Sequence, residues 1–195
     1  MWYPIADKKP VTRYAKGGSI HIPMRHVGRV CLHTAVSSGN SLFSLFNTPG
    51  NPVAHFYLRK DGSLEQYVGT GVRASANLDG NYDMIAIESW DNGGQRETFT
   101  DDQMSGVSLL LVWLHNRHSI PMLALPDSKP GRKGVGWHRL GIDGNFPPGL
   151  LSGRVSGGEH WSESTGKECP FDGKIKQIHD EILPNVRKII RERNK

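Results

Sequence analysis

Apolar and polar positions alternate in short blocks along this chain, and stretches rich in Gly, Pro and Asn separate the blocks. Apolar runs at residues 27–33 and 84–87 predict two strands, the first of them buried. Residues 53–59 and 64–68 flank an Asp-Gly pair at positions 61 and 62, which supplies the positive φ angles that a tight turn needs. These two segments therefore predict a β-hairpin.

Helical patterns occur in three places. Residues 100–119 open with the Thr-x-x-Gln spacing of a capping box and continue with apolar positions at helical intervals. Residues 173–193 predict an amphipathic helix, which Pro184 interrupts or kinks because proline has no N–H to donate. Residues 41–46 are expected to form one or two helical turns.

Strands with helices before and after them favour an α/β fold, with a single mixed β-sheet flanked by helices. Residues 122–166 are glycine-rich, and we expect long irregular loops there. No repeat or linker divides the chain, so residues 1–195 predict one domain with a core at about 27–180. The basic, irregular segment 1–26 and the helix at 173–193 would pack on this core or flank it.

The net charge of +5 is concentrated near the two ends of the sequence. Residues 1–30 carry six Lys or Arg and one acidic residue, and residues 173–195 carry seven and three. Such a distribution favours contact with a polyanion, which includes nucleic acid, anionic lipid and cell-wall polymers, or it reflects only a solvated surface. No nucleic-acid-binding motif accompanies the charge, so we expect no nucleic-acid partner.

Targeting signals are not apparent. The first residues have no apolar stretch behind their charges, so we expect no signal peptide and synthesis in a host cytoplasm. The longest apolar run, residues 109–114, is too short to span a bilayer.

Candidate metal ligands are spread along the chain. His33 ends the first predicted strand, His138 follows Trp137, and Cys169 lies in a loop beside Lys167. Imidazole and thiolate suit zinc, and three protein ligands would leave one position open, as in hydrolytic sites. The alternative for each His is a hydrogen-bonded structural role. Cys31 would face the same side of its strand as His33 and is expected to be a small buried residue, or else a support or ligand.

Five segments, in the same order, resemble the type-2 N-acetylmuramoyl-L-alanine amidases, a family that includes phage endolysins and catalytic peptidoglycan recognition proteins. They are a strand ending in His-Thr-Ala, a His-Phe-Tyr hairpin, an Ile-Ala-Ile-Glu strand, a Phe-Thr helix opening and a Lys-Glu-Cys-Pro loop, at residues 33–35, 54–62, 85–88, 99–103 and 167–170. The resemblance implies an amidase-2 or peptidoglycan-recognition-protein-like fold.

The resemblance also implies roles for individual residues. His33, His138 and Cys169 would hold Zn²⁺, Glu88 would be the general base, and Lys167 would stabilise the oxyanion. Amide hydrolysis needs a nucleophile, a proton shuttle and a positive charge near the tetrahedral oxygen. The alternatives are a surface ion pair for Glu88 and a solvated cation for Lys167.

A groove for glycan and stem peptide would be lined by aromatic and amide side chains. We expect Asn77 and Trp137 to bind substrate, with Trp161 and Tyr82 as further candidates. The alternative for each of these residues is ordinary packing.

Three features depart from the family pattern. Ala54 stands where some relatives carry a catalytic tyrosine, and Phe171 stands where glycine is usual. The separation of 31 residues between His138 and Cys169 is long, which makes His160 the rival second ligand. We favour His138 because residues 135–139 resemble a strand or edge segment entering the site, with residues 140–159 as an insertion.

The expected function is zinc-dependent hydrolysis of the amide bond between N-acetylmuramic acid and L-alanine in bacterial peptidoglycan. The setting would be host lysis by a monomeric phage endolysin that acts on the cell wall, after a separate membrane-permeabilising protein releases it. One alternative is a non-catalytic wall-binding module, which typically loses the thiolate ligand. A second is a zinc peptidase cutting the stem peptide, but no His-Glu-x-x-His motif occurs.

Overall fold

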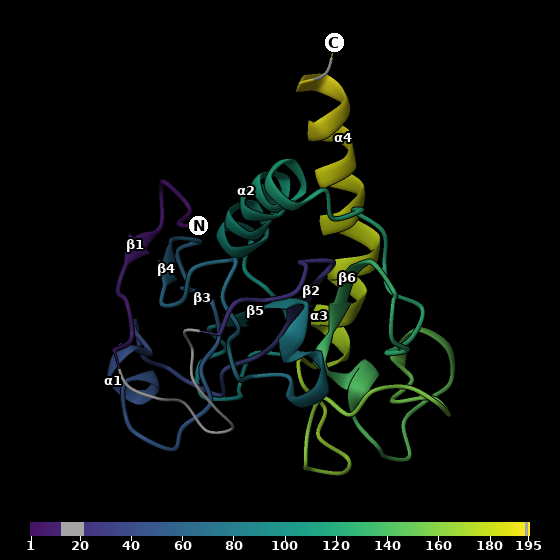
Figure 1. The fold of residues 1–195 in the computed structure, drawn as a ribbon. Coiled ribbons are helices and arrows are strands. Elements are labelled where there is room, and N and C mark those ends of the chain that lie inside the picture. The colour runs from purple at the N-terminus through teal and green to yellow at the C-terminus, as the bar shows by residue number, and fades with distance from the viewer. Residues whose placement is uncertain (13–21, 194) are drawn as a thin grey trace.

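A single six-stranded sheet organises the protein (Figure 1). The computed structural model describes residues 1–12, 22–193 and 195. The strands lie in the order β1-β4-β3-β5-β2-β6, and their bounds are Asp7–Lys8 (β1), Arg29–Leu32 (β2), Phe56–Leu58 (β3), Leu64–Gln66 (β4), Met84–Ser89 (β5) and Gly134–Trp137 (β6). Strands β3 and β4 form the predicted antiparallel hairpin, and the other neighbours pair in parallel. The mixed sheet predicted from the sequence is confirmed.

The parallel pairing of β3, β5, β2 and β6 brings their carboxyl ends to the same edge of the sheet. This edge carries the candidate chemistry. His33 directly follows β2, Glu88 lies near the end of β5, and His138 directly follows β6. In α/β sheets the carboxyl ends of parallel strands are where ligands bind.

The helices are α1 (Phe43–Phe46), α2 (Asp101–His118), α3 (Asp172–Gln177) and α4 (Leu183–Arg193), with short 3₁₀ segments at Leu78–Tyr82, His138–Gly141 and Gly149–Leu151. Helix α2 begins with the predicted capping box, because Thr100 Oγ1 accepts the N–H of Gln103 and Gln103 Oε1 accepts that of Thr100, both at 3.0 Å. Among the described residues, no helix combines the length and apolar character needed to cross a membrane.

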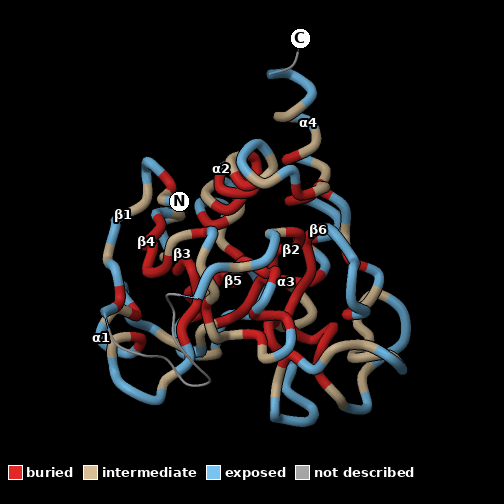
Figure 2. Tube along the Cα trace, viewed as in Figure 1, coloured by how far each residue is buried: buried red, intermediate tan, exposed pale blue. Residues whose placement is uncertain are grey.

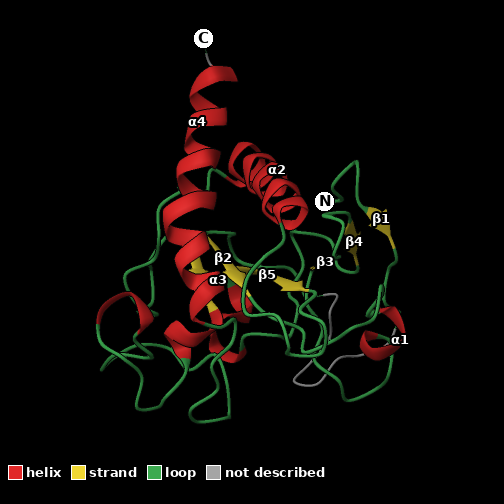
Figure 3. Ribbon diagram, turned by 180° about the vertical axis from the view of Figure 1, so that it is seen from behind, coloured by secondary structure: helices red, strands yellow, loops and turns green. Residues whose placement is uncertain are grey.

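Two apolar clusters pack on opposite faces of the sheet, and Figure 2 shows the buried strands between them. Ile85 and Ile87 join the larger cluster with α2, α3 and α4, whereas Ala86 joins the smaller cluster with α1. Successive strand residues point to opposite faces, so this alternation separates the two layers. Helices α2 and α4 pack side by side over the larger cluster (Figure 3).

The C-terminal helical segment is interrupted where the sequence predicts it. A π-helical turn, Ile178–Ile182, separates α3 from α4 and ends two residues before Pro184. Proline cannot donate the backbone hydrogen bond of a regular helix, and a local change of helical pitch accommodates that loss.

The N-terminal segment is less irregular than the sequence suggests. Asp7–Lys8 forms β1, which pairs in parallel with β4, and the N–H of Lys9 donates to the carbonyl of Gln66 at 2.9 Å. The prediction of an irregular segment over residues 1–26 is therefore wrong for β1, because the backbone of β4 offers partners to a two-residue strand that no periodicity announces. Residues 13–21 of that segment lie outside the described residues.

Candidate metal centre

Three side chains with metal-binding atoms converge at the carboxyl edge of the sheet. Ligand atoms of His33, His138 and Cys169 all lie within 4.8 Å of one another, and the three residues are buried. The two imidazole rings stand 4.2 Å apart between centroids. The histidines directly follow β2 and β6, and the cysteine lies in the loop before α3.

Hydrogen bonds fix which imidazole nitrogen carries the proton. His33 Nε2 lies 2.7 Å from Asn77 Oδ1, and His138 Nε2 lies 2.7 Å from the carbonyl oxygen of Trp161. Both partners are acceptors, so each Nε2 carries hydrogen and each Nδ1 keeps a lone pair. Such bonds from the second ring nitrogen are how proteins orient metal-binding histidines.

Cys169 is held by backbone groups of the residues that directly follow the two histidines. The backbone N–H of Thr34, next to His33, donates to Cys169 Sγ at 3.2 Å. The N–H of Arg139, next to His138, donates to the carbonyl oxygen of Cys169 at 2.9 Å. Backbone groups beside both histidines therefore set the position of the thiol.

Burial shifts the titration of all three groups. It lowers the pKa of His138 to about 4 and that of His33 well below the ordinary value, so both imidazoles are neutral at pH 7. Burial, followed by the nearby Glu88 carboxylate, raises the pKa of the Cys169 thiol to about 12. A bound cation would reverse this preference, because a metal deprotonates the thiol that coordinates it.

The donor set fits Zn²⁺. His138 Nδ1 is buried and has no hydrogen-bond partner among the described residues, which is costly for a polar atom unless something binds it. Two neutral imidazoles and one thiolate form the ligand type of catalytic zinc sites.

Glu88 borders this cluster. Its Oε1 lies 3.7 Å from His33 Nδ1, and its buried Oε2 finds no hydrogen-bond partner in the described part of the chain. Burial raises the pKa of Glu88 to about 7, although the charges of Lys167 and Lys174 oppose the shift. A carboxyl group with a pKa near neutrality can both take up and release a proton at working pH.

A pocket of about 550 Å³ opens over His138. Lys167, Arg73 and Asn81 give it polar walls, and Tyr82 and Trp161 give it aromatic ones. The pocket therefore joins the metal-ligand cluster to a surface that carries charged, amide and aromatic groups.

The remaining sequence candidates lie outside both the ligand cluster and the lining of the pocket. Asn77 is buried behind His33, and Trp137 is buried in the larger apolar cluster, so neither is among the residues described as lining the pocket. His160 lies outside the ligand cluster, with its side chain half exposed and Nδ1 3.5 Å from Asp143. Cys31 is buried in the larger cluster as a free thiol. The substrate contacts of Asn77 and Trp137 stay predictions.

Sequence reasoning missed the groups that orient the ligands. The Thr34 N–H and the Trp161 carbonyl are backbone atoms, which any residue type would supply, so no residue pattern announces them. Phe171, already singled out from the sequence, has a φ of 81°, in the left-handed region that glycine adopts without strain. Its departure from the family's glycine is therefore visible in the backbone.

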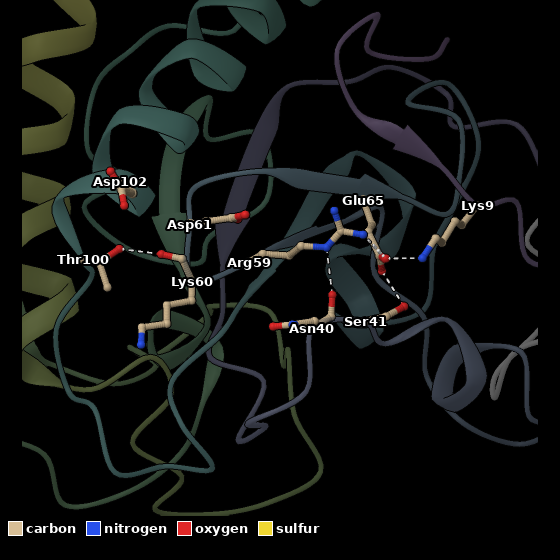
Figure 4. A pocket seen from close by; sticks show the side chains of 9 residues that line it. All are labelled: Lys9, Asn40, Ser41, Arg59, Lys60, Asp61, Glu65, Thr100 and Asp102. Atoms are coloured by element: carbon tan, nitrogen blue, oxygen red, sulfur yellow. Dashed lines mark hydrogen bonds and ion pairs between the residues drawn. The ribbon is translucent and has the colours of Figure 1, made fainter.

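A second pocket, of about 610 Å³, lies beside the β3–β4 hairpin and contains none of the candidate ligands (Figure 4). Its buried carboxylate, Glu65, is already paired with Lys9 and Arg59 and accepts a hydrogen bond from Ser41 at 2.8 Å. The ion pairs of Glu65 therefore link the ends of β1 and β3 to β4 at this pocket. The candidate metal ligand His138 lines the other pocket.

A family model described as N-acetylmuramoyl-L-alanine amidase matches residues 19–170. No curated protein matches the sequence.

Solved structures with a similar fold include an endolysin N-acetylmuramoyl-L-alanine amidase, LysCS, from Clostridium intestinale URNW, with a TM-score of 0.55, 16% identity and coverage of 90% of this chain and 95% of that one. A point mutant of PlyL gives 0.58, 14%, 95% and 98% in the same order. The Staphylococcus aureus hydrolase AmiA, in complex with its ligand, gives 0.53, 15%, 98% and 87%. At these identities the likeness establishes the fold.

Proposed function

The chain belongs to the N-acetylmuramoyl-L-alanine amidase family, and from this membership we propose that it hydrolyses the amide bond between N-acetylmuramic acid and L-alanine in bacterial peptidoglycan, with Zn²⁺ as cofactor. The observation that carries the proposal is the convergence of His33, His138 and Cys169 beside Glu88, whose Oε2 is buried. A site with three ligands and an adjacent carboxylate suits hydrolysis better than simple binding.

The two Nδ1 atoms and the Cys169 thiolate would hold the metal. When bound, Zn²⁺ supplies a Lewis acid and lowers the pKa of a coordinated water. Asn77 and the Trp161 carbonyl keep both imidazoles in the tautomer whose Nδ1 is a lone-pair donor.

Glu88 is the proton carrier in this proposal. Its carboxylate accepts the proton that leaves the attacking water and passes it to the amine of the departing peptide. A pKa of about 7 suits both halves of that transfer, because the group is neither a very weak base nor a very weak acid at neutral pH.

Lys167 supplies the positive charge. It lines the pocket beside His138, and its charge contributes to the lowered pKa values of both histidines and opposes the raised pKa of Glu88. An ammonium group there stabilises the negative charge that develops on the carbonyl oxygen during attack.

The biological setting that we propose is host lysis by a phage-type endolysin acting on the cell wall. The structural neighbour LysCS is itself described as an endolysin. A monomer made in the host cytoplasm and released by a separate membrane-permeabilising protein completes this proposal.

The test combines zinc analysis with mass spectrometry of digested peptidoglycan, on the wild type, Cys169→Ser and the control Cys31→Ala. We expect one zinc per chain, free stem peptides and intact glycan strands for the wild type and the control, and loss of both zinc and products for Cys169→Ser. Cleaved stem peptides would instead identify a peptidase. Wall binding without zinc or products would identify a binding module.

A further inference from the structure

Lys174, on α3, is a buried cation without a part in the proposed chemistry. Its side chain is 0% exposed, although an ammonium group is rarely buried without compensation. Its Nζ donates to Thr34 Oγ1 at 2.8 Å, to Ser89 Oγ at 2.9 Å and to the carbonyl oxygen of Trp90 at 3.4 Å. Three donors thus meet three acceptors.

The ammonium group fixes the direction of two hydroxyl groups. Because Lys174 can only donate, the oxygens of Thr34 and Ser89 accept from it and direct their own hydrogens elsewhere. Thr34 Oγ1 donates to Asp91 Oδ2 at 2.6 Å, and Ser89 Oγ donates to the carbonyl oxygen of His33 at 2.7 Å.

Thr34 and Ser89 each also contact a candidate metal ligand. The Ser89 hydroxyl donates directly to the backbone carbonyl oxygen of His33. Thr34 carries the N–H that donates to Cys169 Sγ at 3.2 Å. One ammonium group therefore connects α3 to two of the three ligands.

Asp91 holds the loop that follows His33. Besides the Thr34 hydroxyl, its buried carboxylate accepts the N–H groups of Val36 at 3.0 Å and Ser37 at 2.8 Å. Val36 has a φ of 49°, a left-handed conformation that is strained for a β-branched residue and persists only where the surroundings impose it. The loop after His33 is therefore held in place by its contacts.

We propose that Lys174 is a positioning residue of the metal centre, which acts through Thr34 and Ser89 to hold the Cys169 thiolate and the His33 imidazole in binding geometry before a metal arrives. This inference rests on the proposed function, since it requires that His33 and Cys169 bind metal. Polar groups that hydrogen-bond to the ligands, without binding the metal, orient the ligands in this way in metal sites generally.

The experiment compares Lys174→Met, Thr34→Val and their combination with two controls. Thr34→Ser keeps the hydroxyl group, and Lys176→Met removes an exposed lysine from the same helix. Zinc affinity is measured by competition with a chromophoric chelator. Ligand geometry is measured from the absorption bands of the Co²⁺-loaded protein, including its thiolate charge-transfer band.

We expect Lys174→Met and Thr34→Val each to weaken zinc binding about tenfold and to shift the Co²⁺ bands. The double variant should lose less than the product of the two single losses, because both changes break the same chain of bonds. Thr34→Ser and Lys176→Met should match the wild type.

Native zinc affinity and unchanged Co²⁺ bands in a folded Lys174→Met protein would overturn the proposal. If that variant does not fold, the comparison of Thr34→Val with Thr34→Ser decides, because valine preserves the shape of threonine and removes only the hydroxyl group. A wild type that binds no zinc, or a Cys169→Ser variant that binds it equally well, would overturn the proposed function and this inference with it.

Discussion

Glu88 Oε1 lies 3.7 Å from His33 Nδ1, the imidazole nitrogen that keeps its lone pair because Nε2 donates to Asn77. The carboxylate therefore faces the atom through which His33 would bind a metal. A carboxylate in this position can exchange protons with a molecule bound at the metal without being a ligand itself.

Replacing Glu88 with glutamine separates these two roles. The amide cannot carry the proton, so turnover on purified peptidoglycan should fall about 10²- to 10⁴-fold, while zinc content stays near one per chain. Glu168→Gln changes an exposed acid next to Cys169 in the sequence and serves as the control. Wild-type turnover in Glu88→Gln would remove Glu88 from the mechanism.

The choice between His138 and His160 is tested by replacing each with alanine. His138 Nδ1 is buried beside Cys169 without a hydrogen-bond partner among the described residues, whereas His160 is half exposed near Asp143. We expect His138→Ala to lose bound zinc and His160→Ala to retain it, as measured by elemental analysis after dialysis. Loss of zinc from His160→Ala alone would reverse the assignment.

Asn77 offers a test between two roles. As the acceptor for His33 Nε2–H it should act on metal affinity, so Asn77→Ala should weaken zinc binding about 10- to 100-fold. Asn77→Asp, which keeps an acceptor oxygen at that position, should retain most of the affinity. A substrate-binding role predicts a different result, in which KM rises and zinc affinity is unchanged.

The elements that the sequence predicts well are those that local chemistry determines. The capping box of α2 and the Asp-Gly turn of the β3–β4 hairpin each depend on residues close together in the chain. Strand β1 could not be predicted, because Asp7–Lys8 has no strand pattern of its own and exists only through pairing with β4.

The same distinction between local patterns and distant contacts applies to the residues of the site. Histidines that follow strand ends and a cysteine in a loop beside a lysine indicate ligand chemistry, but Lys174 lies in a helical pattern where a lysine is expected at the surface. Its burial depends on Thr34, Ser89 and Trp90, which lie 140, 85 and 84 positions away along the chain. No local pattern encodes such a contact.

Gly106 provides a stability test, because helix propensity and packing oppose each other there. Alanine is favoured over glycine inside a helix by about 1 kcal/mol. A Cβ at position 106, however, would lie 2.1 Å from the carbonyl oxygen of Gly62, in the hairpin turn. We expect Gly106→Ala to lower the free energy of unfolding by about 1–3 kcal/mol in urea titrations, as overpacking does.

The control for this packing test is Ser105→Ala, at the exposed neighbouring position of α2. It gains helix propensity without a clash and should leave the protein equally or slightly more stable. A stabilised Gly106→Ala variant would mean that the turn at Gly62 moves aside easily.

Lys174 should also make stability depend on pH. Burial lowers its pKa from 10.5 to about 8, although Asp91 and Cys169 oppose the shift. Between these two values the unfolded chain binds more protons than the folded one, so stability rises with pH. The full contribution is present above pH 10.5 and is lost as the pH falls through 8.

The wild type should therefore gain about 2 kcal/mol in free energy of unfolding between pH 7 and pH 9.5, relative to Lys174→Met at the same pH values. Taking the difference from this variant cancels groups whose pKa does not depend on Lys174, such as the exposed lysines. Urea titrations at half-unit pH steps measure it. A constant difference across that range would mean that the buried ammonium group keeps its ordinary pKa, stabilised by Thr34, Ser89 and Asp91 as well as water would stabilise it.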